Sequence, residues 1–177
     1  MRYGRALGGL VDLRTKAEFP ERNRGYFSVD LYQSTAFIER KIGDKTALSV
    51  SGRRSYIDAV LTPILSSGNV TVQAPRYYDA QVRLLHEDDT GAVWDALVFL
   101  SDDSFRFVGA EADITVALAD RFQRARIRRL YEGSSDWQME TTLSFGPERR
   151  EFQFTGASEA YEERVSLAFR NELALPL

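Results

Sequence analysis

The stretch TAFIERKIGDKTALSVSGRRSYID, residues 35–58, decides the fold that the sequence predicts. Two runs of alternating apolar and polar residues flank a reversal at Ile42-Gly43-Asp44-Lys45. The second run separates completely into two sides: Leu48, Val50 and Gly52 on one, and Ser49, Ser51 and Arg53 on the other. A period of two is typical of a strand with an apolar and a polar side, and Gly-Asp tolerates a tight reversal. The stretch therefore predicts an antiparallel hairpin.

The same alternation continues outward from this hairpin almost to the last residue. It predicts about eight strands, at residues 24–32, 34–42, 46–58, 78–84, 93–100, 122–131, 137–145 and 165–175. A reversal near Gln33-Ser34 separates the first two, and a single long strand is the alternative there. Longer connections are expected at 59–75, which includes a short helix around Ala59-Val60-Leu61, and at 102–120 and 147–162. The sequence therefore predicts an all-β, antiparallel fold.

The composition narrows the class of protein. A chain of 177 residues fits one domain, and its net charge of -3 argues against non-specific binding of nucleic acid. The chain has no cysteine and one histidine, so neither a disulfide framework nor a histidine-rich metal site is expected. No apolar run reaches the roughly 18 residues of a transmembrane helix. The N-terminal residues MRYGRALGGL lack the apolar core of a signal peptide, which by itself predicts a cytoplasmic protein.

Other features favour a wall of strands in a membrane. The connections are predicted to alternate between tight and long, as in outer-membrane barrels with short periplasmic turns and longer external loops. Several strands reach about ten residues, enough to cross a bilayer when tilted. Aromatic residues fall near the predicted strand ends, where an interfacial girdle lies. They are Tyr26, Tyr56, Tyr77, Tyr78, Trp94, Tyr131 and Trp137.

Three segments resemble parts of TonB-dependent outer-membrane receptors. YGRALGGLVDLRTK, residues 3–16, is similar to the end of the plug domain of that family, with structural glycines at Gly4, Gly8 and Gly9. IGDKTALSVSGRRSYID, residues 42–58, resembles an early periplasmic turn and the strand that rises from it. PRYYDAQVRL, residues 75–84, resembles the strand that descends after the first long loop.

The resemblance implies a division into the end of a plug with its connector, residues 1–20, and the first part of a transmembrane β-barrel wall, residues 21–177. Because large transporters of this class have about 22 strands, the chain resembles an internal piece of such a receptor and looks truncated. The implied function is energy-coupled uptake of a scarce nutrient, such as a siderophore, cobalamin or a carbohydrate. The implied partners are outer-membrane lipid, the remainder of the barrel and plug, the TonB energy-coupling complex and an unidentified small-molecule substrate. The implied location is the cell outer membrane.

Charged residues on the polar sides of the strands are the candidate site. The residues expected to line the lumen are Arg53, Asp79, Arg83, Arg124, Arg126, Arg128, Glu140 and Arg170. One interpretation is contact with an anionic ligand, because arginine suits carboxylates and phosphates. The other, which the sequence favours, is a ladder of cross-strand charge pairs that contacts the plug.

The sequence offers no motif for catalysis and no cofactor site. No nucleophile motif is present, so an enzyme is not expected. His86 beside an acidic turn is a weak metal-binding pattern, because acidic residues clustered at a turn are usually only solvated. Asp102-Asp103-Ser104 is a weak one for calcium, because the six to eight oxygen ligands that calcium needs are not gathered in one run. Two other functions stay open: a self-contained eight-stranded barrel that holds a small ligand, and a small structural outer-membrane barrel.

Overall fold

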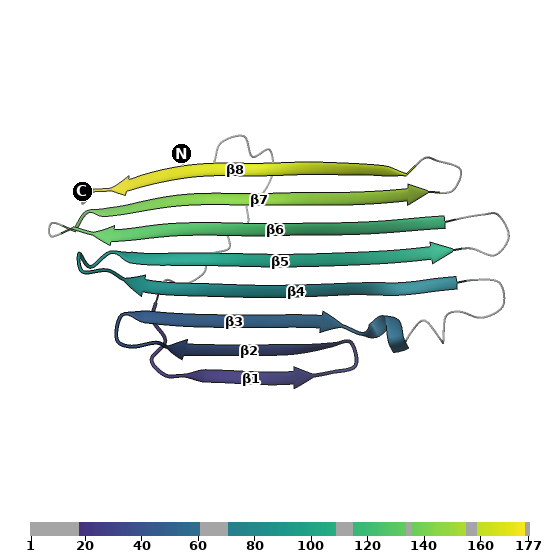
Figure 1. Cartoon of the computed structure of the whole chain (residues 1–177), viewed down its shortest axis with the longest axis horizontal. Helices are drawn as coiled ribbons and strands as arrows, with labels where there is room; N and C mark the ends of the chain where they lie inside the picture. Colours follow the sequence, from purple (N-terminus) through teal and green to yellow (C-terminus); the bar gives the residue numbers. More distant parts are fainter. Residues whose placement is uncertain (1–17, 61–70, 109–114, 134–135, 155–158, 176–177) are drawn as a thin grey trace.

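The computed structural model describes residues 18–60, 71–108, 115–133, 136–154 and 159–175. These residues form one antiparallel sheet of eight strands, each paired with its neighbour in the sequence (Figure 1). The strands are β1 (Arg24–Val29), β2 (Gln33–Lys41), β3 (Thr46–Ser55), β4 (Thr71–Glu87), β5 (Val93–Val108), β6 (Thr115–Glu132), β7 (Gln138–Phe154) and β8 (Ala160–Ala174). The all-β, antiparallel prediction is confirmed.

The hairpin at the centre of the sequence analysis forms as predicted. β2 and β3 pair antiparallel, and the connection between them holds Gly43 at φ 79°, a left-handed conformation that glycine adopts without strain. Ile38 lies opposite Val50 and Thr35 opposite Arg53, so the apolar and polar sides separate as expected.

The sheet is open in the described part of the chain. β1 pairs there only with β2, and β8 only with β7, so the two outer strands do not meet. Each therefore has one edge whose backbone N–H and C=O groups face away from the sheet.

Two of the predicted long connections are wrong. Residues 102–108 and 115–120 extend β5 and β6, and residues 147–154 and 160–162 extend β7 and β8. Polar runs within them, Asp102–Ser104 and Glu148–Glu151, resemble loops in the sequence, but backbone pairing holds them in the sheet. The connection from β3 to β4 remains the long one, although β4 begins at Thr71, before the predicted end of that connection. Residues 57–60 are helical, as predicted for residues 59 and 60, and residue 61 lies outside the described part of the chain.

A tight turn, rather than one long strand, joins β1 to β2. The Oδ1 atom of Asp30 accepts hydrogen bonds from the backbone N–H groups of Tyr32 (2.7 Å) and Gln33 (2.9 Å). A side chain that bonds to the backbone two residues on is the mark of an Asx turn. The reversal therefore lies at residues 30–32, just before the predicted position, and the single-strand alternative is wrong.

The single sheet buries little apolar surface. Among the described residues, the buried apolar side chains are Ala47, Leu85 and Ala92, whereas many large apolar side chains are exposed, including Val98 (46%) and Leu167 (73%). None of the helices in this part of the chain is long and apolar enough to span a membrane.

Candidate membrane-facing surface and arginine cluster

Two rows of polar and aromatic side chains cross one face of the sheet from β4 to β8. The row nearer the β3–β4 connection, here called the loop-end row, contains Tyr78, Asp102, Arg121, Arg149 and Glu163. The row nearer the short turns, here called the turn-end row, contains His86, Trp94, Arg129, Thr141 and Asn171. Within each row the residues lie directly opposite one another on adjacent strands, so both rows lie on the same face.

Between these rows the face is apolar, and we call this area the apolar band. On β4 to β8 its positions are Ala80, Val82, Leu84, Ala96, Val98, Leu100, Gln123, Ala125, Ile127, Leu143, Phe145, Pro147, Val165, Leu167 and Phe169. Gln123 is the one polar member. From Tyr78 to His86 the strand advances eight residues, which is about 26 Å at about 3.3 Å per residue.

The turn-end row is anchored by a network around Asp88. The Oδ1 atom of Asp88 accepts hydrogen bonds from the N–H (2.8 Å) and hydroxyl (2.5 Å) of Thr90, and Oδ2 accepts one from Nε1 of Trp94 (2.8 Å). The bonds from the Thr90 hydroxyl and the Trp94 indole hold the pKa of the Asp88 carboxyl well below its usual range. In the same turn region, a hydrogen bond to Asp89 raises the pKa of Lys45. The indole of Trp94 therefore has a fixed orientation at the edge of the apolar band.

The opposite face, here called the polar face, contains all eight residues predicted to line a lumen. The register puts them there because they occupy the alternate positions of β3 to β8. Arg53 donates to Oδ2 of Asp79 through Nε (2.7 Å) and Nη2, and the Ser101 hydroxyl donates to Oδ1 (2.9 Å). The predicted cross-strand charge pair therefore exists between β3 and β4.

Asp95 is the centre of a charge cluster on this face, and its side chain is completely buried. Nε of Arg83 donates to Oδ1 (2.9 Å). Nη2 atoms of Arg126 (3.0 Å) and Arg128 (2.7 Å) both donate to Oδ2. Three of the predicted arginines, from β4 and β6, thus converge on one carboxylate of the strand between them. We call these four residues the Asp95 cluster.

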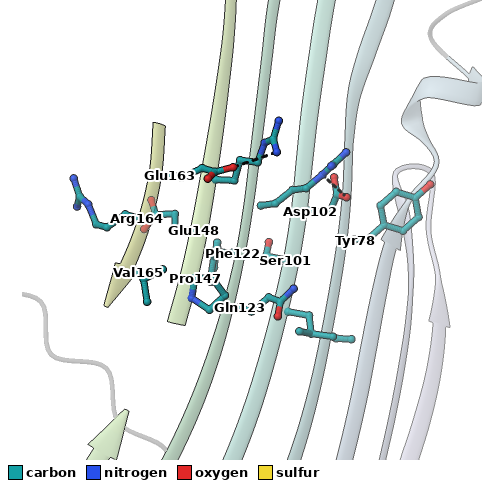
Figure 2. Close-up of a pocket in the computed structure, with 14 residues that line it drawn as sticks. Tyr78, Ser101, Asp102, Phe122, Gln123, Pro147, Glu148, Glu163, Arg164 and Val165 are labelled. Carbon is teal, nitrogen blue, oxygen red and sulfur yellow. Dashed lines mark hydrogen bonds and ion pairs between the residues drawn. The ribbon is translucent and has the colours of Figure 1, made fainter. Parts of the chain in front are cut away.

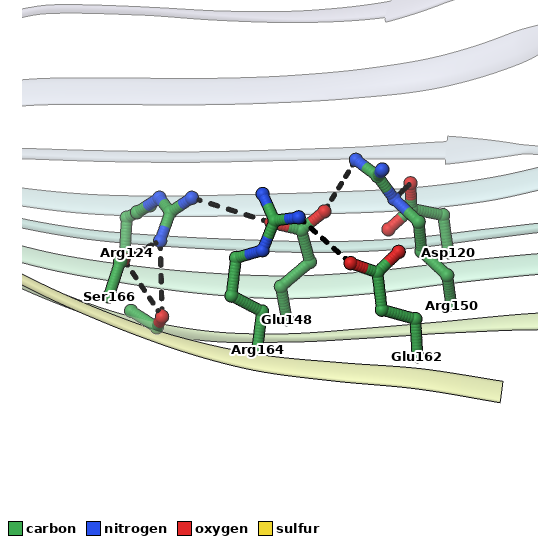
Figure 3. Close-up of polar contacts among 8 residues, drawn as sticks. Asp120, Arg124, Glu148, Arg150, Glu162, Arg164 and Ser166 are labelled. Atoms are coloured by element: carbon green, nitrogen blue, oxygen red, sulfur yellow. Dashed lines mark hydrogen bonds and ion pairs between the residues drawn. The ribbon is translucent and has the colours of Figure 1, made fainter.

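Arg124 belongs to a second network, nearer the loop-end row (Figure 3). Its Nη1 atom donates to the carbonyl oxygen of Gly146 (3.1 Å) on β7 and to the hydroxyl of Ser166 (2.5 Å) on β8. Gly146 lies next to Arg124 on the polar face, because a Cβ atom there would meet the guanidinium of Arg124 and would lie 2.5 Å from the carbonyl oxygen of Gln123. The absence of a side chain on β7 therefore lets Arg124 reach across to β8.

The ladder continues beyond Arg124 toward the β7–β8 connection. Arg150 pairs with Glu148 (2.5 Å) and Asp120 (3.1 Å), and Arg164 pairs with Glu162 (2.8 Å) (Figure 3). Most of these side chains are about half exposed, and exposed ion pairs contribute little to stability. This part of the face is therefore a solvated ladder of charges.

A shallow groove of about 560 Å³ lies along the loop-end row (Figure 2). Four of its charged side chains pair with one another, Arg121 with Asp102 (3.0 Å) and Arg149 with Glu163 (3.2 Å). Apolar residues of the band, including Leu100 and Val165, form its other side. The groove therefore lies between the loop-end row, whose charges pair with one another, and the apolar band.

The remaining predicted residues lie outside these networks or outside the described part of the chain. Glu140 lies directly opposite Glu172, and Arg170 pairs with Glu172 at 3.6 Å. Gly4, Gly8 and Gly9 fall outside the described residues. The sequence analysis did not select Asp95, although a single acidic residue in the otherwise apolar run 93–100 was the signal that could have identified it.

The comparisons with known proteins do not identify a family. The chain matches no protein-family model, no curated protein and no solved structure.

Proposed function

We propose that this chain forms part of the wall of an outer-membrane β-barrel, with the apolar face toward lipid and the polar face toward the interior. The observation that carries the proposal is the apolar band between two polar and aromatic rows. A transmembrane strand needs about 9–11 residues when tilted, and the outward apolar band of such barrels is about 25 Å tall with aromatic residues at both borders. From one row to the other β4 spans nine residues, Tyr78 to His86 inclusive.

The arrangement of the charges supports the same orientation. A water-soluble barrel that holds an apolar ligand directs its apolar side chains inward and its charges outward. Here the buried carboxylate of Asp95 and its arginines lie on one face, whereas Val98, Phe145 and Leu167 are exposed on the other. Exposure of so many large apolar side chains over five adjacent strands is a liability in water but suits contact with lipid.

Within this class, we propose a segment of a TonB-dependent receptor that takes up a scarce nutrient. The support is the resemblance of residues 3–16, 42–58 and 75–84 to the plug end, an early turn and a descending strand of that family. The open edges of β1 and β8 agree with it, because lipid cannot satisfy unpaired backbone groups and further strands would. The remainder of the barrel is then the structural partner of both edges.

The test is fractionation in a Gram-negative host of the full genomic reading frame and of the 177-residue chain. We expect the long product in the outer membrane, heat-modifiable on gels and resistant to protease, while the short product aggregates. A short product that is soluble, monomeric and rich in β-structure would refute the proposal and favour a ligand-binding barrel.

A further inference from the structure

Two arginines flank one tyrosine where the loop-end row begins, between β3 and β4. Arg54 of β3 lies directly opposite Tyr78 of β4, and Arg76 lies two residues before Tyr78 on the same strand. Alternate residues of a strand share a face, so all three lie on the face of the apolar band. The guanidinium carbons of Arg54 and Arg76 each lie 5.3 Å from the centre of the Tyr78 ring. Cation–π attraction therefore holds two positive charges beside one ring.

Neither of these charges has an acidic partner among the described residues. In that part of the chain no hydrogen bond or ion pair joins Arg54 or Arg76 to a carboxylate, and Nε of Arg76 is buried without a hydrogen-bond partner. The adjacent acidic residue of the row, Asp102, lies opposite Tyr78 on β5 and pairs with Arg121 at 3.0 Å (Figure 2). This end of the row therefore carries two guanidinium groups that pair with no described carboxylate.

The contact with Tyr78 leaves both arginines able to bind an oxyanion. A guanidinium has about five N–H donors, and its attraction to a ring is electrostatic rather than a hydrogen bond to an acceptor atom. Two parallel N–H groups of one guanidinium match two oxygens of a phosphate. Arg54 is exposed and Arg76 is half-buried, so an anion can approach the pair from outside the sheet.

The surface beside the two arginines is apolar and has only small side chains. One step along the strands into the band, Gly52 of β3 lies opposite Ala80 of β4, and Ala36 of β2 lies on the other side of Gly52. A Cβ atom on Gly52 would meet no atom closer than 3.9 Å, so the space over it is open. An acyl chain can therefore lie close to the backbone here while its headgroup stays beside Arg54 and Arg76.

We propose that Arg54 and Arg76, held by Tyr78, bind the phosphate group of an anionic membrane lipid whose acyl chain lies on the apolar band. The inference rests on the proposed function, because lipid reaches this face only where the face lies in a membrane. Unpaired positive charges select a lipid with net negative charge. A zwitterionic headgroup brings its own cation to its phosphate and gains less from the two arginines.

The test titrates the full 177-residue chain, folded in uncharged maltoside micelles, with short-chain phosphatidylglycerol. NMR signals of the arginine Nε–H groups report binding at each guanidinium. We expect saturable shifts at Arg54 and Arg76. Short-chain phosphatidylcholine, which lacks net charge, and inorganic phosphate, which lacks acyl chains, are each expected to bind at least about tenfold more weakly. Equal binding of phosphatidylcholine would overturn selection by charge, and equal binding of inorganic phosphate would overturn a lipid as the occupant.

Arg54→Gln is the first variant, because Arg54 is exposed and its replacement leaves no buried gap. We expect it to bind phosphatidylglycerol at least about tenfold more weakly, since hydrogen bonds to charged groups are strong. Arg76→Lys keeps the charge but loses the fork, and is also expected to bind more weakly. Arg40→Gln is the matched control: Arg40 lies on the same face, opposite Leu48 and near the short turns. Its affinity should change less than about threefold, because distant sites act independently.

The possible failures are distinguishable. Absence of saturable shifts in the folded chain, or equal weakening by Arg40→Gln, would overturn the inference and leave the membrane proposal intact. A chain that is soluble and monomeric without micelles would refute the membrane proposal and this inference with it.

Discussion

At the scale of single residues, Gly146 controls a contact between strands that are not neighbours. Its missing side chain leaves room for the guanidinium of Arg124 to pass over β7 and reach Ser166 on β8. The Ser166 hydroxyl also donates to the Gly146 carbonyl at 3.1 Å. Three strands are therefore joined through one position that has no side chain.

Gly146→Ala is expected to destabilise the folded chain by about 1–3 kcal/mol, the usual cost of overpacking. The new Cβ would meet the backbone carbonyl of Gln123, which cannot move aside cheaply. Urea unfolding in micelles measures the change in unfolding free energy. Gly52→Ala is the control, because its Cβ would lie 3.9 Å from the nearest atom, the carbonyl oxygen of Asp79. Equal effects of the two substitutions would contradict this explanation.

The hydrogen bonds of Asp88 predict that the stability of the β4–β5 turn depends on pH. Its pKa is lower in the folded chain than in the unfolded chain, so its contribution is complete above the unfolded value of about 3.9 and disappears as the pH falls through the folded value. Amide exchange of Gly91 and Ala92 is therefore expected to show constant protection between about pH 5 and 8 and weaker protection in stronger acid.

The neighbouring residues Lys45, Glu87 and Asp89 are also charged, so the variants must separate their effects from that of Asp88. Asp88→Asn is expected to remove most of the pH dependence and to loosen Trp94, which its fluorescence would report. Asp89→Asn removes the ion pair with Lys45 (3.0 Å) and is expected to leave the pH dependence of the turn in place. Unchanged acid sensitivity in Asp88→Asn would argue against this assignment.

At the scale of the strands, alternation predicted which strands exist but not where they end. Within the apolar band the side chains differ sharply between faces, so each strand was identifiable from sequence. From the loop-end row outward, as in Asp102–Ser104 and Arg149–Glu151, both faces carry polar side chains, and the pattern disappears although the backbone pairing continues. Strand ends there are set by hydrogen bonds between chain segments, which a single sequence does not reveal.

For the candidate site, the sequence predicted which face of the sheet holds the residues, but not which residues pair with one another. A period of two is sufficient to assign Arg53, Asp79, Arg83 and the other predicted residues to one face. Their partners depend on the register, which brings Arg83 of β4 and Arg128 of β6 to Asp95 of β5. Because nothing in the local sequence fixes that register, Asp95 was missed.

The pair formed by Arg53 and Asp79 is expected to contribute to the alignment of β3 with β4. Their side chains are 48% and 14% exposed, so the coupling should resemble that of a surface pair, about 0.2–1 kcal/mol, and should decrease with added salt. A double-mutant cycle with Arg53→Ala and Asp79→Ala measures it. A coupling that is unaffected by salt would show that packing, rather than charge, links the two strands.

At the scale of the whole molecule, one face of the sheet suits an apolar environment and the other suits water. The apolar band covers β4 to β8 without interruption except at Gln123, while the polar face holds a buried ionic cluster. In the described part of the chain this single sheet has no second layer over its apolar side. The proposed lipid contact supplies that cover.

Ala125→Arg tests this arrangement directly. Ala125 lies in the middle of the apolar band, opposite Val98 and Phe145, so an arginine there is expected to cost about 2–4 kcal/mol in a bilayer. Ala119→Arg is the matched control on the same strand and face, beyond the loop-end row and opposite Glu151. Folding into lipid vesicles, followed by urea titration, compares the two. Equal costs, or no cost at either position, would refute contact of the band with lipid.

The extension of the strands beyond the loop-end row has an electrostatic consequence. On β5 the sheet continues from Asp102 to Val108, about 20 Å at about 3.3 Å per residue. The Debye length at physiological ionic strength is about 8 Å. In a barrel whose longer connections face outward, the field of the lipid headgroups is therefore screened before it reaches the far end of the sheet. A charged solute that arrives from outside would first respond to the protein's own charges, whatever the composition of the surrounding membrane.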